Sequence, residues 1–264
     1  MEPKAEPKNN LGIAMFTVRQ SAERDLSGTL QNLAAFGYTG IEFYGAPVWS
    51  PQEIRTALKN SGMAITGYHT EYRDLQKDTR QKTAEFLNEI GCPLAVVPCL
   101  GGRWHVGHTE AEETFATWQK HIAWLQETEE FLKTCSVRTG YHNHEHEFLL
   151  QYGGKTVFDH IFESLPTLVM ELDSGACIEG GGDPTAVLQK YRDHPKILHM
   201  KPFSKTRGFD VSLGDADDEN DWASYFSPEN RFEWLLAESE NKILSEAENA
   251  QRCISGAQRF LKGE

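Results

Sequence analysis

Short apolar stretches alternate along the chain with longer amphipathic stretches, and this alternation repeats eight times. Each apolar stretch has the length of a buried strand, and each amphipathic stretch carries apolar residues at the spacing of one helix face. The pattern predicts strands over residues 11–18, 39–45, 63–70, 93–100, 137–144, 167–175, 196–203 and 232–240. It predicts helices between them, the longest over about 109–135 and the last ending near Leu261.

Eight strand–helix units without a long linker or a break in composition favour an α/β fold, a single (β/α)8 TIM barrel over residues 11–264. A doubly wound open sheet is the alternative, but no glycine-rich phosphate-binding turn follows the first predicted strand. Residues 1–10 are polar and contain two prolines, so we expect a disordered lead-in there.

Charge and composition narrow the classes of partner. The formal net charge of −13 disfavours nucleic acid and anionic membranes, and no apolar run approaches the roughly 18 residues of a membrane helix. The five cysteines include no CxxC pair, which is typical of free thiols in a reducing compartment. We therefore expect a cytoplasmic protein as the chain stands, with a removed export signal as the alternative, and a small-molecule ligand; homo-oligomerisation stays open.

Ionisable residues recur where the predicted strands end, which is where (β/α)8 barrels place their catalytic groups. They are Glu42, His69, Glu71, His142, His144, Glu147, Asp173, His199, Lys201 and Glu238. Each one alone could be a satisfied core histidine, a turn-capping carboxylate or a solvated charge. Together, a buried cluster of imidazoles and carboxylates without a cation would be costly. The set therefore favours one divalent ion (Mn, Co, Mg or Zn) with open positions for substrate oxygens.

Three other stretches have two interpretations each. In GYHNHEHEF (140–148) the histidines alternate with the period of a strand, so only one or two of them face the barrel interior. Trp104, in GGRWHVGH, either stacks on a sugar or packs in a turn. The acidic loop 214–222 lacks the spacing of an EF-hand, and we expect a solvated loop. An ordinary basic loop is preferred to a phosphate site for Ser204, Lys205 and Arg207.

These motifs resemble the sugar phosphate isomerase/epimerase family of xylose isomerase-like TIM barrels, over about residues 11–261. The resemblance rests on GYTGIEFYG, GYHNHEHEF, LDSGACIEGGGDP, ILHMKPF and LLAESE. That family holds one divalent ion with a Glu of strand five, an Asp of strand six, a His of strand seven and a Glu of strand eight. The resemblance thus implies that the last three ligands are Asp173, His199 and Glu238.

Strand five departs from the family pattern, because the position of the family's Glu falls on His142. The nearest downstream carboxylate, Glu147, is expected to curl back as the fourth ligand, with His142 or His144 as ligand or base otherwise. The resemblance also implies that Lys201 approaches substrate oxygens. It implies pocket-lining positions for Glu42, His69, His142 and Trp104.

The implied activity is metal-dependent sugar isomerisation or epimerisation of a ketose or keto-sugar through an enediolate, with Glu147, Glu238, His144 and Lys201 as catalytic residues. The alternative is a metal-dependent lyase or dehydratase acting on keto-inositols or 3-keto-glycosides, for which the YHNH stretch is the cue. A metal-dependent endonuclease is disfavoured by the negative charge. A non-catalytic carbohydrate-binding barrel is disfavoured by the intact ligand positions.

Overall fold

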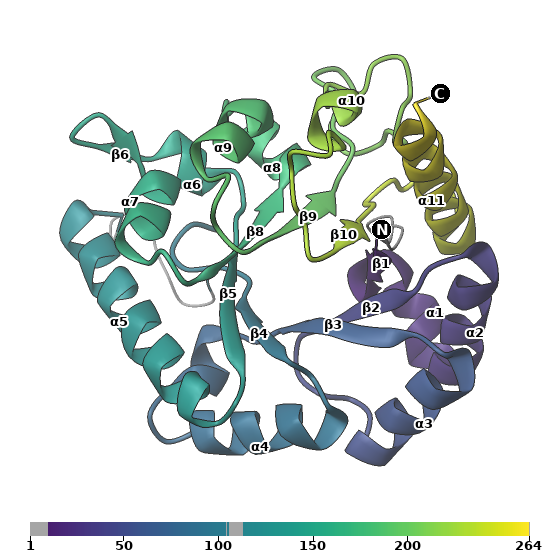
Figure 1. The fold of residues 1–264 in the computed structure, drawn as a ribbon, viewed down its shortest axis with the longest axis horizontal. Helices are drawn as coiled ribbons and strands as arrows, with labels where there is room; N and C mark the ends of the chain where they lie inside the picture. Colours follow the sequence, from purple (N-terminus) through teal and green to yellow (C-terminus); the bar gives the residue numbers. More distant parts are fainter. Residues whose placement is uncertain (1–9, 104, 106–112, 264) are drawn as a thin grey trace, which may run out of the picture.

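The chain folds as a closed barrel of eight parallel strands with helices outside it (Figure 1). The structure, a computed structural model, describes residues 10–103, 105 and 113–263. Around the barrel the strands follow the order β1-β10-β9-β8-β5-β4-β3-β2. They are β1 (Leu11–Ala14), β2 (Gly40–Tyr44), β3 (Ala64–His69), β4 (Leu94–Val97), β5 (Arg138–His142), β8 (Val169–Asp173), β9 (Lys196–Met200) and β10 (Leu235–Ala237). The predicted (β/α)8 barrel is confirmed.

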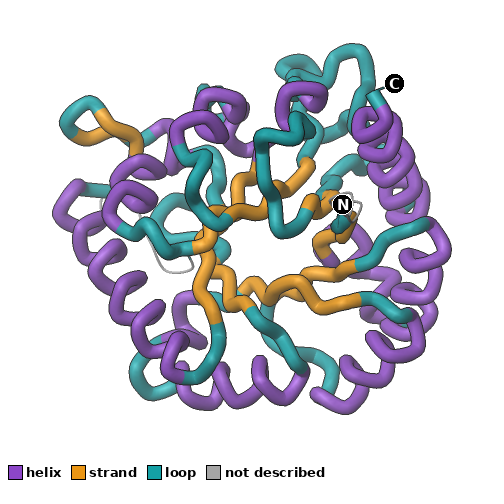
Figure 2. The backbone as a smooth tube through the Cα atoms, viewed as in Figure 1, coloured by secondary structure: helices purple, strands orange, loops and turns teal. Residues whose placement is uncertain are grey.

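Helices surround the strands on all sides, as Figure 2 shows by colour. They are α1 (Arg19–Arg24), α2 (Leu26–Phe36), α3 (Pro51–Ser61), α4 (Arg80–Ile90), α5 (Phe115–Thr134), α6 (His146–Leu149), α7 (Val157–Ser164), α8 (Ser174–Glu179), α9 (Pro184–Lys190), α10 (Trp222–Tyr225) and α11 (Glu246–Lys262). Short 3-10 turns cover Met15–Val18 and Tyr72–Leu75. No described helix combines the length and the apolar character needed to cross a bilayer.

Several element boundaries differ from the sequence-based expectation. Most strands are shorter than predicted at both ends, and the difference is larger at their carboxyl ends, because the apolar pattern continues into the turns that follow them. At the end of β8, for example, Asp173 Oδ1 accepts a hydrogen bond from the Ala176 backbone N–H at 2.8 Å and begins α8. The hairpin of β6 (Gln151–Tyr152) and β7 (Lys155–Thr156) was not expected. The predicted lead-in falls, apart from Asn10, outside the described residues.

The barrel interior is apolar in its lower part, towards the amino ends of the strands, and ionisable in its upper part, towards their carboxyl ends. A small inner cluster, fully buried, fills the lower part with Leu94, Val96, Val169, Ile197 and Leu236. Towards the carboxyl ends of the strands the inward positions change to glutamate, aspartate and histidine. The upper end of the barrel is therefore where a polar ligand or an ion would be held.

Candidate metal centre and active site

Seven ionisable side chains from six strands meet at the carboxyl end of the barrel. Strand pairing aligns them, because His142 lies opposite Glu171 and Asp173 lies opposite His199 in register. The set comprises Glu42 on β2, His69 on β3, His142 on β5, Glu171 and Asp173 on β8, His199 on β9 and Glu238 just after β10. Six of the seven follow from the strand-end rule alone, but Glu171, two residues before the end of β8, was not predicted.

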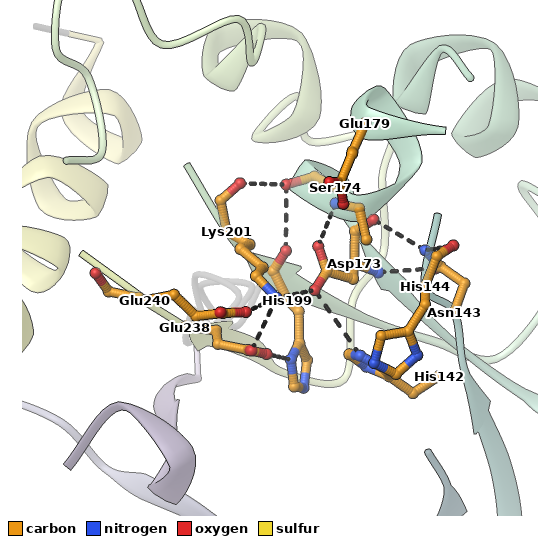
Figure 3. A network of polar contacts seen from close by, with 12 residues as sticks. His142, Asn143, His144, Asp173, Ser174, Glu179, His199, Lys201, Glu238 and Glu240 are labelled. Carbon is orange, nitrogen blue, oxygen red and sulfur yellow. Dashed lines mark hydrogen bonds and ion pairs between the residues drawn. The ribbon is translucent and has the colours of Figure 1, made fainter. Parts of the chain in front are cut away.

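His142, Asp173, His199 and Glu238 form a buried group whose ligand atoms all lie within 4.8 Å of one another. His199 Nδ1 is 2.7 Å from Glu238 Oε2, and His142 Nε2 is 3.8 Å from Asp173 Oδ2 (Figure 3). Three of these four residues are the ligands that the resemblance implied. The fourth is His142, which was the alternative on strand five.

Glu147 lies outside this group, although it was the first choice for the strand-five ligand. Its side chain is fully buried, and both oxygens have other partners. Oε1 accepts a hydrogen bond from the Tyr141 hydroxyl at 2.5 Å and lies 3.0 Å from His146 Nε2. Oε2 accepts one from the His144 backbone N–H at 2.8 Å. The chain turns outward into α6 after His144, so Glu147 supports the loop from behind and does not reach the barrel axis.

Lys201 follows β9 and sits among three carboxylates. Its Nζ is 3.3 Å from Asp173 Oδ2, 3.1 Å from Glu238 Oε1 and 2.6 Å from Glu240 Oε1. Burial alone lowers the pKa of the ammonium, but these carboxylates outweigh it and hold the pKa well above its usual range. Burial likewise raises the pKa of Glu238, and Lys201 and His199 outweigh it, so this pKa is well below the usual range. Lys201 is therefore a fixed cation beside two of the candidate ligands.

His144 stands beside the candidate ligands without joining them. Its ring centroid lies 5.2 Å from that of His142, and it lines the same cavity. Burial and the nearby His142 and Lys201 hold its pKa well below the usual range, so its imidazole is neutral. Asn143, between the two histidines, accepts a hydrogen bond from the Asp173 backbone N–H at 2.9 Å and ties the two strand ends together.

Glu171 and Glu42 lie beneath the candidate ligands. Glu171 is completely buried, and its Oε2 is 2.7 Å from His69 Nε2 and 3.1 Å from His142 Nδ1. Glu42 Oε2 is 2.9 Å from His199 Nε2 and 3.1 Å from His69 Nε2. Burial lowers the pKa of His69, but Glu42 and Glu171 outweigh it and raise the pKa to about 10. His69 and Glu42 thus belong to the floor of the site as well as to its wall.

A cavity of about 390 Å³ opens above the cluster. Its walls include the predicted positions Glu42, His69, His142, His144, Lys201 and Glu238. Aromatic side chains at its sides come from Phe16, Tyr44 and Phe209. Trp104, the predicted stacking residue, lies outside the described residues. The cavity has the size and the mixed lining of a small-molecule site.

The charged side chains of the loop after β9 pair with one another. Arg207 pairs with Asp215 and Asp217, and Lys205 pairs with Glu219 at 2.9 Å. Neither cation lines the cavity. The acidic stretch 214–222 is thus a loop of mostly exposed or half-buried residues, several of whose carboxylates pair with Arg207 and Lys205.

The donor set fits a divalent ion. Two imidazoles and two carboxylates suit Mn, Co or Zn, and carboxylates suit Mg as well. Among the described residues, Asp173 Oδ2 and His199 Nε2 are buried and have no hydrogen-bond partner of good geometry, and both oxygens of Glu42 share this condition. Buried carboxylate oxygens without a well-formed hydrogen bond are costly. The ammonium of Lys201, 3.3 Å away, offsets part of this cost at Asp173 Oδ2, and a bound cation would offset more of it.

Known proteins resemble this chain at the levels of sequence and fold. The inosose dehydratase of Geobacillus kaustophilus is 25% identical over 193 residues, which cover 65% of this chain and 60% of that protein. A sugar phosphate isomerase/epimerase from Parabacteroides distasonis superposes with a TM-score of 0.77 at 20% identity, covering 98% of this chain and 97% of the other. A xylose isomerase-like TIM barrel protein from Mycobacterium smegmatis, solved in complex with magnesium, superposes with a TM-score of 0.62 at 12% identity, covering 97% and 96%.

The two structural similarities are below 25% identity and show the fold alone, and the match to the dehydratase leaves about two fifths of that protein uncovered. The sequence profile of the xylose isomerase-like TIM barrel family matches residues 30–254, which is most of the chain. The chain belongs to the xylose isomerase-like TIM barrel family.

Proposed function

We propose that the protein is a divalent-metal-dependent enzyme that removes a proton next to the carbonyl group of an unphosphorylated keto-sugar, and that loss of the β-hydroxyl group follows. One observation carries the proposal. Two of the four candidate ligands, His142 and Glu238, line one cavity of sugar size together with the neutral imidazole of His144 and the ammonium of Lys201, and the other two ligands lie buried directly against them.

The ion would be held by His142, Asp173, His199 and Glu238. When bound, it would act as a Lewis acid on the carbonyl and hydroxyl oxygens of the substrate and so acidify the neighbouring C–H bond.

His144 would accept the proton, because it is the neutral base on the cavity wall. Lys201 would stabilise the negative charge that develops on the substrate oxygen, since its ammonium is already fixed in place by Asp173 and Glu238. In the elimination, the electron pair of the broken C–H bond forms the C=C bond. The β-hydroxyl group then leaves as water with the proton that His144 returns on the same face.

Elimination is favoured over isomerisation by the position of Glu147. Epimerisation needs two proton-transferring groups on opposite faces of the substrate, and the expected pair was Glu147 with Glu238, or one of these two with His144. The Glu147 carboxylate accepts hydrogen bonds from the Tyr141 hydroxyl and the His144 backbone N–H, away from the cavity. Similarity to an inosose dehydratase supports the same choice. Isomerisation or epimerisation is the second candidate, supported by the name of the Parabacteroides distasonis neighbour. It would need a group such as Glu238 on the second face.

An uncharged substrate follows from the charges on the cavity wall. Five glutamates line it, namely Glu42, Glu145, Glu179, Glu238 and Glu240. The lysine and arginine side chains described there, Lys201 and Arg103, are both paired, Arg103 with Glu145 at 2.9 Å. The third cation, His69, is paired with Glu42 and Glu171. A phosphate group would meet repulsion from most of the wall.

The test is proton exchange in D2O followed by NMR. The wild-type protein, loaded separately with Mn, Co, Mg or Zn, is incubated with a keto-inositol, a 3-keto-glucoside, a simple ketose and a ketose phosphate. We expect loss of water from a neutral keto-sugar, abolished by Glu238→Gln and by chelation. Solvent deuterium in a recovered epimer would instead establish the second candidate. Metal-dependent sugar binding without exchange at any substrate would refute an enzymatic role and favour a carbohydrate-binding barrel.

A further inference from the structure

Three histidines from three strands point at one oxygen atom of Glu171. Glu171 Oε2 lies 2.7 Å from His69 Nε2, 3.1 Å from His142 Nδ1 and 3.3 Å from His199 Nε2. The carboxylate is fully buried, and it does not line the cavity. The proposed reaction gives it no part, yet a buried carboxylate at the centre of three imidazoles must affect how they are held.

Two overlapping ligand groups share the rings of His142 and His199. The upper group adds Asp173 and Glu238, and the lower group adds His69 and Glu171. The two groups face opposite nitrogens of the shared rings. Each ring lies between an upper and a lower carboxylate: His142 between Asp173 and Glu171, His199 between Glu238 and Glu42.

A neutral imidazole offers a metal one nitrogen and carries its proton on the other, where it needs an acceptor. An ion in the upper group therefore turns the lower carboxylates into acceptors for the two N–H groups. An ion in the lower group would instead make the upper carboxylates, those of Asp173 and Glu238, the acceptors for the two N–H groups.

Charge decides between the two groups, because access does not: His142 lines the cavity in both, with Glu238 in the upper group and His69 in the lower group. The upper group offers a divalent ion two carboxylates, those of Asp173 and Glu238, whereas the lower group offers only that of Glu171. Two negative charges balance a divalent ion, so we place the ion in the upper group.

We propose that Glu171 is a positioning residue for the metal centre. It accepts the Nδ1–H of His142 and, with Glu42, faces the Nε2–H of His199, and so presents Nε2 of His142 and Nδ1 of His199 to the ion. This inference rests on the metal site of the proposed function. Carboxylate partners of this kind typically change metal affinity by about 10–100-fold.

The variant Glu171→Gln tests the proposal through metal binding, without any substrate. Glutamine keeps the volume and one oxygen acceptor, and Glu238→Gln is the matched control for a true ligand. Co(II) is titrated into each metal-free protein by calorimetry, and the visible absorption of bound Co(II) reports its ligand field. We expect wild type and Glu171→Gln to bind about one ion each, with affinity about 10–100-fold lower in the variant and an altered absorption spectrum. Glu238→Gln should lose the site.

An unchanged affinity and spectrum in Glu171→Gln would overturn the inference and leave the proposed function standing. Two ions in the wild type and one in the variant would also overturn it, because Glu171 would then be a ligand. No Co(II) binding by the wild type would remove the metal site and the proposed function with it.

A second measurement needs no variant, should Glu171→Gln fail to fold. In the wild type loaded with ¹¹³Cd and ¹⁵N-histidine, coupling between metal and nitrogen identifies the bound ring atoms. We expect Nε2 for His142 and Nδ1 for His199. The opposite pair of nitrogens would place the ion in the lower group and refute the assignment.

Discussion

Replacing Glu147 by glutamine should destabilise the protein without removing the metal ion that we propose. The carboxylate is fully buried and is bonded to the Tyr141 hydroxyl and the His144 backbone N–H. It also lies 3.0 Å from His146 Nε2; burial lowers the pKa of that imidazole, but Glu147 outweighs it and raises the pKa to about 12. The variant therefore leaves a buried histidine without its anion.

The magnitude follows from these contacts. Glutamine keeps one oxygen acceptor, but its amide N–H2 must face either the N–H of His144 or the hydroxyl of Tyr141. A hydrogen bond to a charged group contributes about 1.5–3 kcal/mol, and an unpaired buried donor costs about 1–3 kcal/mol. Since these ranges partly describe the same loss, we expect a free-energy decrease of about 2–4 kcal/mol, which lowers the melting temperature by roughly 4–16 °C.

Thermal melts of the metal-free proteins, followed by circular dichroism, measure this loss, and elemental analysis measures the ion. Tyr141→Phe serves as the control, because it removes one partner and its effect should not add fully to that of Glu147→Gln. If Glu147→Gln melted like the wild type when metal-free and yet lost its ion, Glu147 would be a ligand and the outward turn after His144 would be wrong.

Three further predictions concern the site itself. Lys201→Met should bind Co(II) at least as tightly as the wild type, because a cation beside Glu238 is removed, while turnover falls; calorimetry and the exchange assay measure the two effects. Gly175→Ala should lower stability by about 1–3 kcal/mol in urea unfolding, because a Cβ there would lie 2.6 Å from the Lys201 carbonyl oxygen. Burial lowers the pKa of His199, but Glu171 and Glu42 outweigh it and raise the pKa well above its usual range. In the metal-free protein His199 is therefore an imidazolium. Its contribution to folding stability is full below about pH 6.5 and is lost as the pH rises through the raised pKa. Metal binding must displace that proton, so affinity should rise with pH, and calorimetry in buffers of different ionisation enthalpy should detect about one proton released at pH 7.

Much of the fold could be predicted because buried parallel strands and amphipathic helices leave distinct patterns. The same patterns place strand ends, so position alone puts Asp173, His199 and Glu238 among the candidate site residues. The carboxyl ends of β8 and β9 lie side by side in the barrel, with Asp173 opposite His199.

Two residues show where sequence reasoning stops. Glu147 is five positions after His142, and no pattern indicates that the chain turns outward into α6 between them. Glu171 lies within an apolar stretch two residues before Asp173. Because side chains alternate along a strand, an inward Asp173 requires an inward Glu171, and this parity was the available signal. The convergence of three imidazoles on Glu171 depends on the barrel's closure, which no local pattern contains.

Histidine at position 142 changes both the charge and the chemistry of the proposed site relative to the family's glutamate. A ligand set of two glutamates, an aspartate and a histidine carries three negative charges, whereas Asp173 and Glu238 with two imidazoles carry two. A divalent ion held by this set would be balanced and not over-neutralised, and it would therefore polarise a substrate carbonyl group more strongly. The same substitution removes a carboxylate that could exchange protons on the second face of a sugar. Stronger polarisation of the carbonyl group, with His144 as a single neutral base, suits the removal of one proton followed by loss of a leaving group. It suits less well a reaction in which the proton is returned to another carbon.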